Sequence, residues 1–484
     1  MTPRRVPWFW VVFFATTAWK AIAAFKLTLC QDESYYHYWS LFPQFGYYDH
    51  PPLTAWAMAL SGRLFGGSIL TVRFWPLAAG IALVLLGRAF ARKLYDERTA
   101  EGTGIGLAIL PIFVGNGLVM TPDALLAVCW AASVVLLWQA LEKPGAADWS
   151  SWVLAGVAVG VGLLAKYTMI LFFLGLGVYW LAAPEDRGRL ARRGWLCVVT
   201  ALVVFSPVVF WNAQHDWVSF RFQVYHGLGG SLGLSSLRTL GEYIGALLLI
   251  ASPVVGLLMF WSAGRALYLR ERRGRFLASF FWAPVIFFAY SSLKARVEAN
   301  WPMVALVSGT VILAHDWPGY SRRLRLAAGV FLLVPVTALM IYLLLPADLP
   351  LTFRGTSCDP RRMREFIVAP AIAREVSRMK LKTGADIVCT SSHQLFGMIS
   401  YYDPELRDSL WLPSMGRVRF PWIDASRWEG KSALLVSTRP DDWRGRDGFQ
   451  AAKELGSVAI PYKKYRTETL YFHRLNGYQS RDTR

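Results

Sequence analysis

The sequence is poor in charged residues, which make up 17% of its 484 residues, against roughly 25% in soluble domains. Hydrophobic residues account for 55% and the mean hydropathy is +0.34. This balance excludes an ordinary soluble globular protein. We find no low-complexity linker and no fixed-period repeat.

Cysteine is also scarce. The five cysteines include no Cys-x-x-Cys pair and no Cys/His spacing typical of structural zinc. Cys129 and Cys197 lie inside apolar runs and are interpreted as small core residues. Cys358 and Cys389 fall in the polar C-terminal segment, where an oxidising compartment would permit a disulfide between them.

Long apolar runs dominate the first 345 residues. A membrane-spanning helix needs about 20 apolar residues, and we predict about eleven transmembrane helices. The ranges are 7–29, 70–92, 102–120, 122–141, 150–165, 168–184, 194–212, 240–263, 276–293, 299–315 and 325–345. The first run is longer than the apolar part of a signal peptide and lacks a small-residue cleavage site, so we expect it to be a retained span.

The net charge of +19 is explained by where the basic residues lie. Arginine and lysine cluster before the first run and after the second, sixth, eighth and tenth runs. If the spans alternate, these loops share one side, which the positive-inside rule makes cytoplasmic. The 31–69 loop, the 213–239 loop and everything after residue 346 then lie outside.

Two domains are predicted, a membrane domain over 1–345 and a small α/β domain over 346–484 on the outer side. In the second, 385–391, 432–438 and 469–475 are predicted strands, and 359–380 and 448–455 are predicted helices. In the first outer loop, 31–69, aromatic spacing and a Pro-Pro start favour two interfacial helices. "GYYDHPP" between them is a predicted rigid turn.

Unusual polar residues collect on the predicted outer side, which suggests one site there. They are Asp32, Glu33, Asp49, His50, Arg73, Asp123, Lys166, His215, Asp216, Lys294, Arg296, Glu298 and Asn300. Simpler readings stay open for several of them. Asp123 follows Pro122 and would complement a helix dipole, Lys166 would snorkel, and Lys294 and Arg296 would be surface charges. His215 and Asp216 would belong to a solvated loop, and Asp32–Glu33 would be a helix-end pair.

The motifs "QDESYYHYWS", "GYYDHPPLTAW", "VRFWP", "TPDALLA", "LLAKYTMIL" and "KARVEANWP" occur in the order found in bacterial glycosyltransferases of the GT-C fold. The chain resembles the dolichyl-phosphate-mannose-protein mannosyltransferase-like branch, related to the lipid A aminoarabinose transferase. The similarity runs over nearly the whole chain and is weak in 346–484. It implies transfer of a sugar from a polyprenyl-phosphate carrier to an acceptor, with inversion, at the periplasmic face of the bacterial inner membrane.

The resemblance also implies residue roles. Asp32 becomes the candidate general base, with Glu33 in support, because a hydroxyl acceptor must lose its proton as it attacks. If the acceptor is a phosphate, Asp32 would instead orient it or stabilise oxocarbenium charge. Asp49 is a further catalytic candidate. The candidates for binding the donor phosphate are His50, Arg73, Lys166, Lys294 and Arg296. The candidates for binding substrate are Tyr35, Tyr36, Tyr48, Asp123, Glu298, Asn300 and Trp301.

His50 differs from the basic residue of the lipid A relative, so its role stays open between phosphate contact, proton donor and metal ligand. A divalent metal held by Asp32, Glu33, Asp49 and His50 is left undecided, and no organic cofactor is expected. The sugar is not specified, and the acceptor would be lipid A, lipopolysaccharide core, another glycolipid or a protein. Arg354, Arg361 and Arg362 weakly favour an anionic acceptor.

Two other classes of function were considered. A transporter or flippase of lipid-linked sugars should show inverted repeats with matching broken spans, which we do not find. A sensor or scaffold leaves the acidic first loop unexplained.

Overall fold

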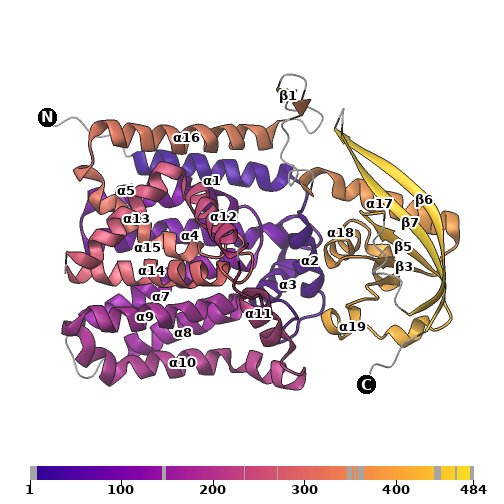
Figure 1. The fold of residues 1–484 in the computed structure, drawn as a ribbon, viewed down its shortest axis with the longest axis horizontal. Helices are drawn as coiled ribbons and strands as arrows, with labels where there is room; N and C mark the ends of the chain where they lie inside the picture. The colour runs from indigo at the N-terminus through magenta and orange to yellow at the C-terminus, as the bar shows by residue number, and fades with distance from the viewer. Residues whose placement is uncertain are drawn as a thin grey trace. The chain divides into compact units, whose positions relative to one another are not determined.

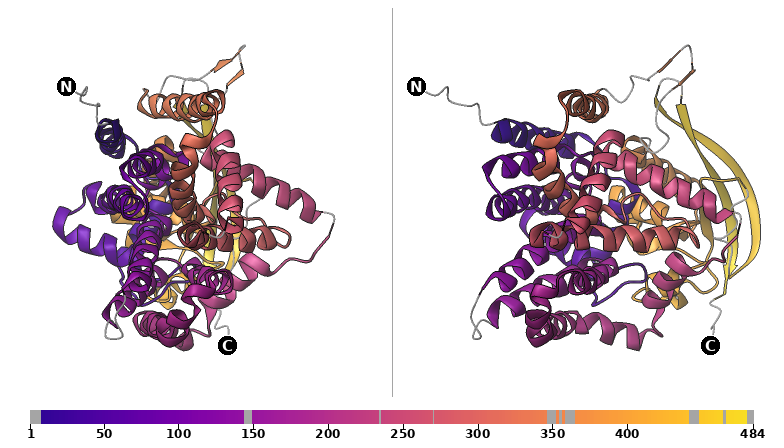
Figure 2. Two further views of the ribbon diagram at one scale, coloured as in Figure 1. Left: turned by 90° about the vertical axis from the view of Figure 1, so that its left-hand side faces the viewer. Right: turned by 60° about the vertical axis from the view of Figure 1, so that its left-hand side comes forward.

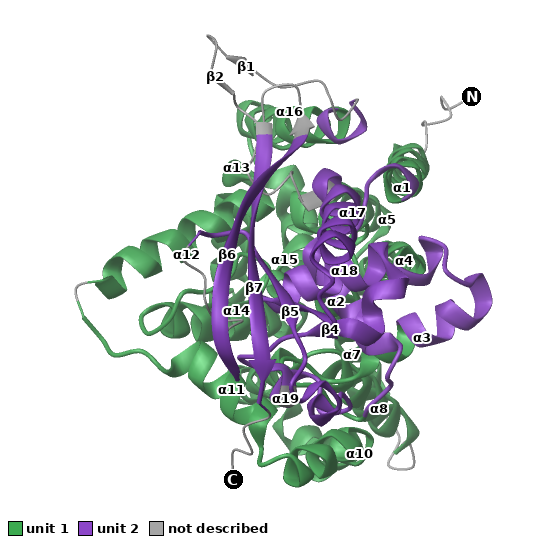
Figure 3. Ribbon diagram, turned by 90° about the vertical axis from the view of Figure 1, so that its right-hand side faces the viewer, with its two compact units in different colours: residues 1–24, 45–57, 73–341 green, residues 25–44, 58–72, 342–484 purple. Residues whose placement is uncertain are grey.

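The computed structural model describes residues 8–143, 149–233, 235–269, 271–345, 352–353, 356–357, 365–440, 448–463 and 466–479. The chain divides into two compact units, each assembled from separate stretches of sequence (Figure 3). Unit 1 comprises 1–24, 45–57 and 73–341. Unit 2 comprises 25–44, 58–72 and 342–484.

Unit 1 is built almost entirely from helices that run side by side (Figure 1). Its elements are α1 (Trp8–Lys26), α4 (Leu70–Leu94), α5 (Glu97–Ile109), α6 (Pro111–Asn116), α7 (Pro122–Glu142), α8 (Ser150–Ala165), η1 (Tyr167–Ile170), α9 (Leu171–Ala182), η2 (Pro184–Asp186), α10 (Arg187–Gln214), α11 (Val218–Leu228), α12 (Ser235–Ala251), α13 (Pro253–Tyr268), α14 (Arg272–Ser292), α15 (Met303–Asp316), η3 (Trp317–Gly319) and α16 (Arg322–Leu344). The first residues of α4 and the ends of α1 and α16 belong to unit 2.

Every predicted apolar run overlaps a helix of the structure. Six helical segments within the described ranges are long and apolar enough to cross a membrane: α1, α4, α7, η2–α10, α14 and α16. The bent pair α12–α13 would make a seventh, and α8 and η1–α9 are shorter apolar helices. The mainly helical membrane domain is therefore confirmed, while the number of eleven spans stays a prediction.

The run at 240–263 is not one straight helix. It breaks at Ser252, where α12 and α13 meet at 102°. Ser252 has a positive φ of 70°, and Pro253 is the first residue of α13. Proline disfavours helical geometry in the residue before it, so the chain turns at this point.

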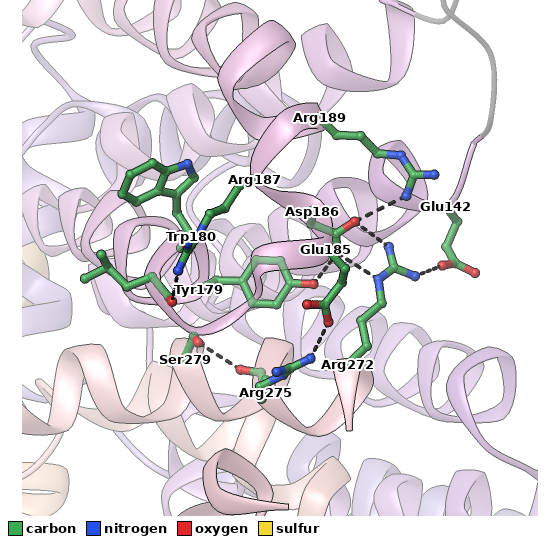
Figure 4. A network of polar contacts seen from close by, with 11 residues as sticks. Glu142, Tyr179, Trp180, Glu185, Asp186, Arg187, Arg189, Arg272, Arg275 and Ser279 are labelled. Carbon is green, nitrogen blue, oxygen red and sulfur yellow. Dashed lines mark hydrogen bonds and ion pairs between the residues drawn. The ribbon is translucent and has the colours of Figure 1, made fainter. Parts of the chain in front are cut away.

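A buried carboxylate ties several helix ends of unit 1 together (Figure 4). Asp186, in η2, is fully buried and accepts from Arg272 of α14 at 2.7 Å and from Arg189 of α10 at 3.2 Å. Its carboxylate also accepts from the Tyr179 hydroxyl, and Arg272 pairs with Glu142 at the end of α7. Part of the basic cluster predicted from charge bias is therefore used in ion pairs that hold helix ends.

Unit 2 combines two helices of the first loop with the C-terminal segment. Its elements are α2 (Gln31–Ser40), most of α3 (Leu53–Phe65), β1 (Thr352–Phe353), β2 (Thr356–Ser357), α17 (Glu365–Thr383), β3 (Ile387–Thr390), α18 (His393–Tyr402), η5 (Pro404–Ser409), β4 (Leu410–Trp411), α19 (Gly416–Arg419), η6 (Ala425–Trp428), β5 (Ala433–Ser437), β6 (Phe449–Lys463) and β7 (Arg466–Tyr478). The two helices predicted in the 31–69 loop are thus present as α2 and α3.

The main sheet of unit 2 has the order β4-β3-β5-β7-β6, parallel from β4 to β5 and antiparallel beyond. Cys389, Trp411 and Leu435 belong to its core. Strands β6 and β7 form a long curved ribbon (Figure 2). The predicted strands at 385–391, 432–438 and 469–475 correspond to β3, β5 and β7, and the predicted helix at 359–380 corresponds to α17.

The predicted helix at 448–455 is wrong, because this segment begins strand β6. Its Ala, Lys, Glu and Leu residues favour a helix in isolation. Pairing along β7 overrides that preference, and Gly448 and Gly456 adopt positive φ angles of 87° and 96°. Gly456 stands at a register shift in the ladder, where a bulge takes up one extra residue.

The suggested disulfide is not observed among the described residues. Cys389 carries a free, fully buried thiol in β3, and Cys358 lies outside the described residues. Arg354, Arg361 and Arg362 also lie outside them.

Candidate active site

A buried ion pair with an amide partner lies in unit 1 where several helices begin or end. Asp123, in the first turn of α7, is 3% exposed, and Lys166, just after α8, is 6% exposed. The Lys166 ammonium donates to the two Asp123 oxygens at 2.8 and 3.0 Å, and Asn300 Nδ2 donates to Oδ2 at 2.7 Å. The structure therefore brings three predicted site residues together, and Asp123 does more than complement a helix dipole.

Local backbone geometry explains this convergence. Pro122 occupies the first position of α7, where its missing N–H leaves no hydrogen bond unmade, and Asp123 follows it. Lys166 is extended, with φ −156° and ψ 137°, so α8 stops there and the side chain leaves the helix end. Asn116, at the end of α6, donates to the Asp123 carbonyl at 3.2 Å and fixes the 116–123 loop from the other side.

The predicted cations after α14 are more open. Lys294 lies over the Tyr290 ring at 5.1 Å, and Arg296 is exposed and 3.7 Å from Glu298. Trp301 packs beside His226, with ring centroids 5.3 Å apart. Neither cation is committed to a buried carboxylate, so both stay candidates for contact with a phosphate.

The turn at 46–50 is held by α10, which was predicted as the span 194–212, and by α11, which lies in the predicted 213–239 loop. The Tyr47 N–H donates to the His50 carbonyl at 3.1 Å, which makes the turn predicted for "GYYDHPP". Gln223 of α11 donates to the carbonyl of the buried Asp49 at 2.5 Å, and Tyr48 packs on Phe222 at 4.7 Å. A β-carbon at Gly46 would lie 2.6 Å from the Trp211 ring, so only glycine fits there.

The two remaining residues of the 213–239 region that had been singled out have local roles. His215 stacks on Trp211 with ring centroids 4.1 Å apart, and His215 Nδ1 is hydrogen-bonded to the Trp211 carbonyl at 2.8 Å. Asp216 has a positive φ of 52° in the turn that leads to α11. Arg73 of α4 is fully buried, and its Nη1 donates to the Ala24 carbonyl at 2.8 Å.

The acidic pair belongs to α2 of unit 2, where its two members differ. Asp32 is exposed, whereas Glu33 is fully buried and accepts from the Cys30 N–H at 3.0 Å, as in a capping box. Glu33 thus has a structural task at the start of α2. Asp32, by contrast, is an exposed residue of the same helix turn.

The aromatic residues that follow the acidic pair are buried inside unit 2. Tyr35 is 2% exposed; its ring lies 4.6 Å from His393, and its hydroxyl accepts from Arg419 at 3.0 Å. Tyr36 is also buried and packs on Trp39. The partners His393 and Arg419 lie more than 350 residues further along the chain, and the sequence holds no signal of these contacts.

Two buried histidines make the stability of unit 2 sensitive to acid. Burial lowers the pKa of His37 to about 4, with a smaller effect of Arg407, and burial lowers the pKa of His393 to about 3, assisted by Arg419. Below pH 6.5 the unfolded chain binds protons at these rings while the folded unit does not. We therefore expect stability to fall as pH drops from 6.5 toward 4, by about 2 kcal/mol per histidine near pH 5.

Thermal unfolding followed by tryptophan fluorescence near pH 7.5 and near pH 5 measures this loss. The variants His37→Phe and His393→Phe serve as controls, because each should remove about 2 kcal/mol of the loss near pH 5. An undiminished pH dependence in the double variant would assign the effect to other groups.

Metal ligation was tested on the same geometry. Within the described part of the chain, no group of three or more His, Cys, Asp and Glu side chains could hold a metal ion. Whether a divalent metal binds at Asp32, Glu33, Asp49 and His50 therefore stays undecided.

Comparisons with known proteins agree on one class. The sequence profile of the family described as dolichyl-phosphate-mannose-protein mannosyltransferase matches residues 49–211. The lipid A galacturonosyltransferase RgtD of Rhizobium johnstonii is 25% identical over 386 residues, 78% of each chain. The undecaprenyl phosphate-alpha-4-amino-4-deoxy-L-arabinose arabinosyl transferase of Pseudomonas aeruginosa is 27% identical over 59% of this chain. The match spans about half of that relative, 52% of its length.

Solved structures extend the likeness to the whole chain. ArnT from Cupriavidus metallidurans bound to undecaprenyl phosphate superposes with a TM-score of 0.65 at 17% identity, over 96% of this chain and 98% of ArnT. The archaeal oligosaccharyltransferase AglB from Archaeoglobus fulgidus gives 0.51 at 12% identity, over 89% and 69%. At these identities the likeness concerns the fold. Together with the sequence relatives, these matches give the chain the fold of the multi-pass GT-C glycosyltransferases and a likeness to the galacturonosyl and aminoarabinose transferases among them.

Proposed function

We propose that this protein transfers a sugar from a polyprenyl-phosphate carrier to lipid A or another lipopolysaccharide acceptor, with inversion, at the periplasmic face of the inner membrane. The observation that carries the proposal is the buried Asp123–Lys166–Asn300 cluster at helix ends of an apolar bundle. Charged groups at such a depth are costly and mark a site that handles polar substrate. The relative named as a lipid A galacturonosyltransferase supports the acceptor class.

The length of α7 supports the proposed side of the membrane. Asp123 stands at its start and Glu142, which pairs with Arg272, at its end. A helix of 21 residues is about 30 Å long, the thickness of the hydrocarbon core. The positive-inside rule favours a cytoplasmic position for the arginine-rich end, and this supports a periplasmic position for the Asp123 cluster.

The proposed chemistry needs little from the protein beyond orientation and charge. The leaving phosphate gains negative charge as the glycosidic bond breaks, and fixed cations in a water-poor site stabilise it. Lys294, Arg296 and His50 are the candidates for this contact in unit 1. Asp32 receives the proton of a hydroxyl acceptor or faces the oxocarbenium charge on the sugar.

The test is the mass spectrum of lipid A, core oligosaccharide, glycolipids and envelope proteins from a strain lacking the gene, with and without the restored chain. We expect a sugar-sized increment on lipid A or core only in the restored strain. An increment on proteins alone would instead support a protein acceptor, as in the name of the matching family, dolichyl-phosphate-mannose-protein mannosyltransferase. Absence of any increment in all four fractions would contradict glycosyl transfer and return attention to transport.

A further inference from the structure

Unit 1 contains a second buried lysine, which neither the motifs nor the proposed chemistry uses. Lys20 lies in α1, a helix apolar enough to span the membrane, and is 6% exposed. It stands six residues before the helix end, or about 9 Å along the axis. Across the described ranges, its ammonium makes no hydrogen bond or ion pair, in contrast to Lys166.

The space around this ammonium is shaped by two glycines. A β-carbon at Gly117, which follows α6, would lie 3.0 Å from Lys20 Nζ and 3.3 Å from its Cδ. Gly80 of α4 has no side chain either, and a β-carbon there would lie 3.1 Å from the Gly117 α-carbon. The end of the Lys20 side chain therefore packs against backbone at Gly80 and Gly117, where the absence of side chains makes room for it.

That place adjoins the site. Gly117 follows Asn116, which bonds the Asp123 carbonyl, so the 116–123 loop has Lys20 against one part and Lys166 against another. Lys166 is neutralised by Asp123, whereas no carboxylate of the described residues pairs with Lys20. One turn further along α1, the carbonyl of Ala24 accepts from the buried Arg73, so a second cation borders the same helix.

A buried ammonium without a counter-ion is costly in an apolar bundle, and such charges are normally paired or bind a ligand. We propose that Lys20 is an anion-binding residue of this transferase and receives an oxyanion of a membrane-borne substrate. The group is either the phosphate of the polyprenyl carrier or the carboxylate of an acidic sugar carried on it. The inference rests on the proposed function. It adds a cationic contact in α1 to the contacts of Lys294, Arg296 and His50.

Binding of undecaprenyl phosphate to the full chain in nanodiscs tests the phosphate. Lys20→Met keeps the length of the side chain and removes the charge, so we expect about 10- to 100-fold weaker binding, the usual range for one charged hydrogen bond. Lys26→Met, at the exposed end of the same helix, is the matched control and should bind as the wild type does. Lys20→Gln provides a second neutral variant should the first express poorly.

Thermal unfolding of the same samples separates binding from a structural role. Removing an unpaired buried charge should leave the Tm unchanged or raise it, whereas removing a structural ion pair would lower it. A clear fall in Tm for both neutral variants would overturn the inference.

A second arm compares polyprenyl-phosphate donors that carry a neutral hexose and a uronic acid. If Lys20→Met weakens only the uronosyl donor, the oxyanion is the sugar carboxylate; if it weakens all three ligands, it is the phosphate. Wild-type binding with an unchanged affinity in the variant would refute the inference alone. Wild type that binds none of the three ligands would refute the proposed function and the inference with it.

Discussion

Replacing Asp32 by asparagine is expected to lower the rate of sugar transfer by about 100- to 10,000-fold, the range that one general base contributes. Asparagine has nearly the same shape, so it preserves contacts but cannot take a proton or oppose positive charge. Because Asp32 is exposed in α2, the change leaves no buried hole. The folded fraction and the Tm should therefore match those of the wild type, and single-turnover transfer measures the effect.

Glu33→Gln is the matched control, one residue away on the same helix. Glutamine still offers an oxygen to the Cys30 N–H, so the start of α2 should persist. We expect its transfer rate to fall far less than that of Asp32→Asn. Should Asp32→Asn stay within about threefold of wild type while Glu33→Gln is inactive, the base would be Glu33, and its buried position would then be a catalytic feature.

The chemical type of the acceptor decides how large the rate defect of Asp32→Asn should be. A hydroxyl acceptor needs a base, so the defect of Asp32→Asn should be large at every pH near neutrality. A phosphate acceptor is already ionised and needs little base catalysis, so a small defect would favour a phosphate-bearing position on the acceptor. The size of the effect thus carries information about the acceptor as well as about the residue.

Helix positions were the most predictable part of the fold. The runs at 122–141 and 325–345 became α7 (Pro122–Glu142) and α16 (Arg322–Leu344) because apolar length, and for α7 a proline at the start, are local signals. The turn at Ser252 and the strand β6 were missed because each depends on what the segment packs against. In β6 an alanine-rich stretch pairs along β7, and a local pattern does not carry that information.

The site was predictable as a set of residue types and not as a set of contacts. Asp123, Lys166 and Asn300 were each singled out as polar residues near spans, but Asp123 and Asn300 are 177 residues apart and nothing in the sequence pairs them. Lys20 was hidden because one lysine inside an apolar run looks like an ordinary feature of a spanning helix. Its proposed role depends on its contacts with Gly80 of α4 and with Gly117, the residue after α6, and the sequence does not show these contacts.

The second large effect is expected at the buried ion pair. Lys166→Met removes the cation and leaves the Asp123 carboxylate with Asn300 as its remaining side-chain partner, and Asp123→Ala leaves the ammonium without its carboxylate. Breaking a buried pair from one side typically costs about 3 to 5 kcal/mol. We expect each single variant to lose stability by that order, measured by thermal or denaturant unfolding in detergent.

The exposed pair Arg238–Glu242, with side chains 84% and 50% accessible, is the matched control. Its removal should cost less than about 1 kcal/mol, because water already solvates both charges. Loss of similar size at the two pairs would show that the Asp123 pair is not desolvated as its burial indicates.

The double variant Asp123→Asn/Lys166→Met separates stability from function. It has no charge at positions 123 and 166, and the new amide still offers an oxygen to Asn300. It should therefore be more stable than Lys166→Met alone. If the pair exists only to hold α7 and α8 together, the double variant should regain transfer along with stability. If the lysine or the carboxylate contacts substrate, stability returns and transfer does not. We expect the second result, because a pair of charges kept at the ends of apolar helices costs more than an apolar contact of the same size.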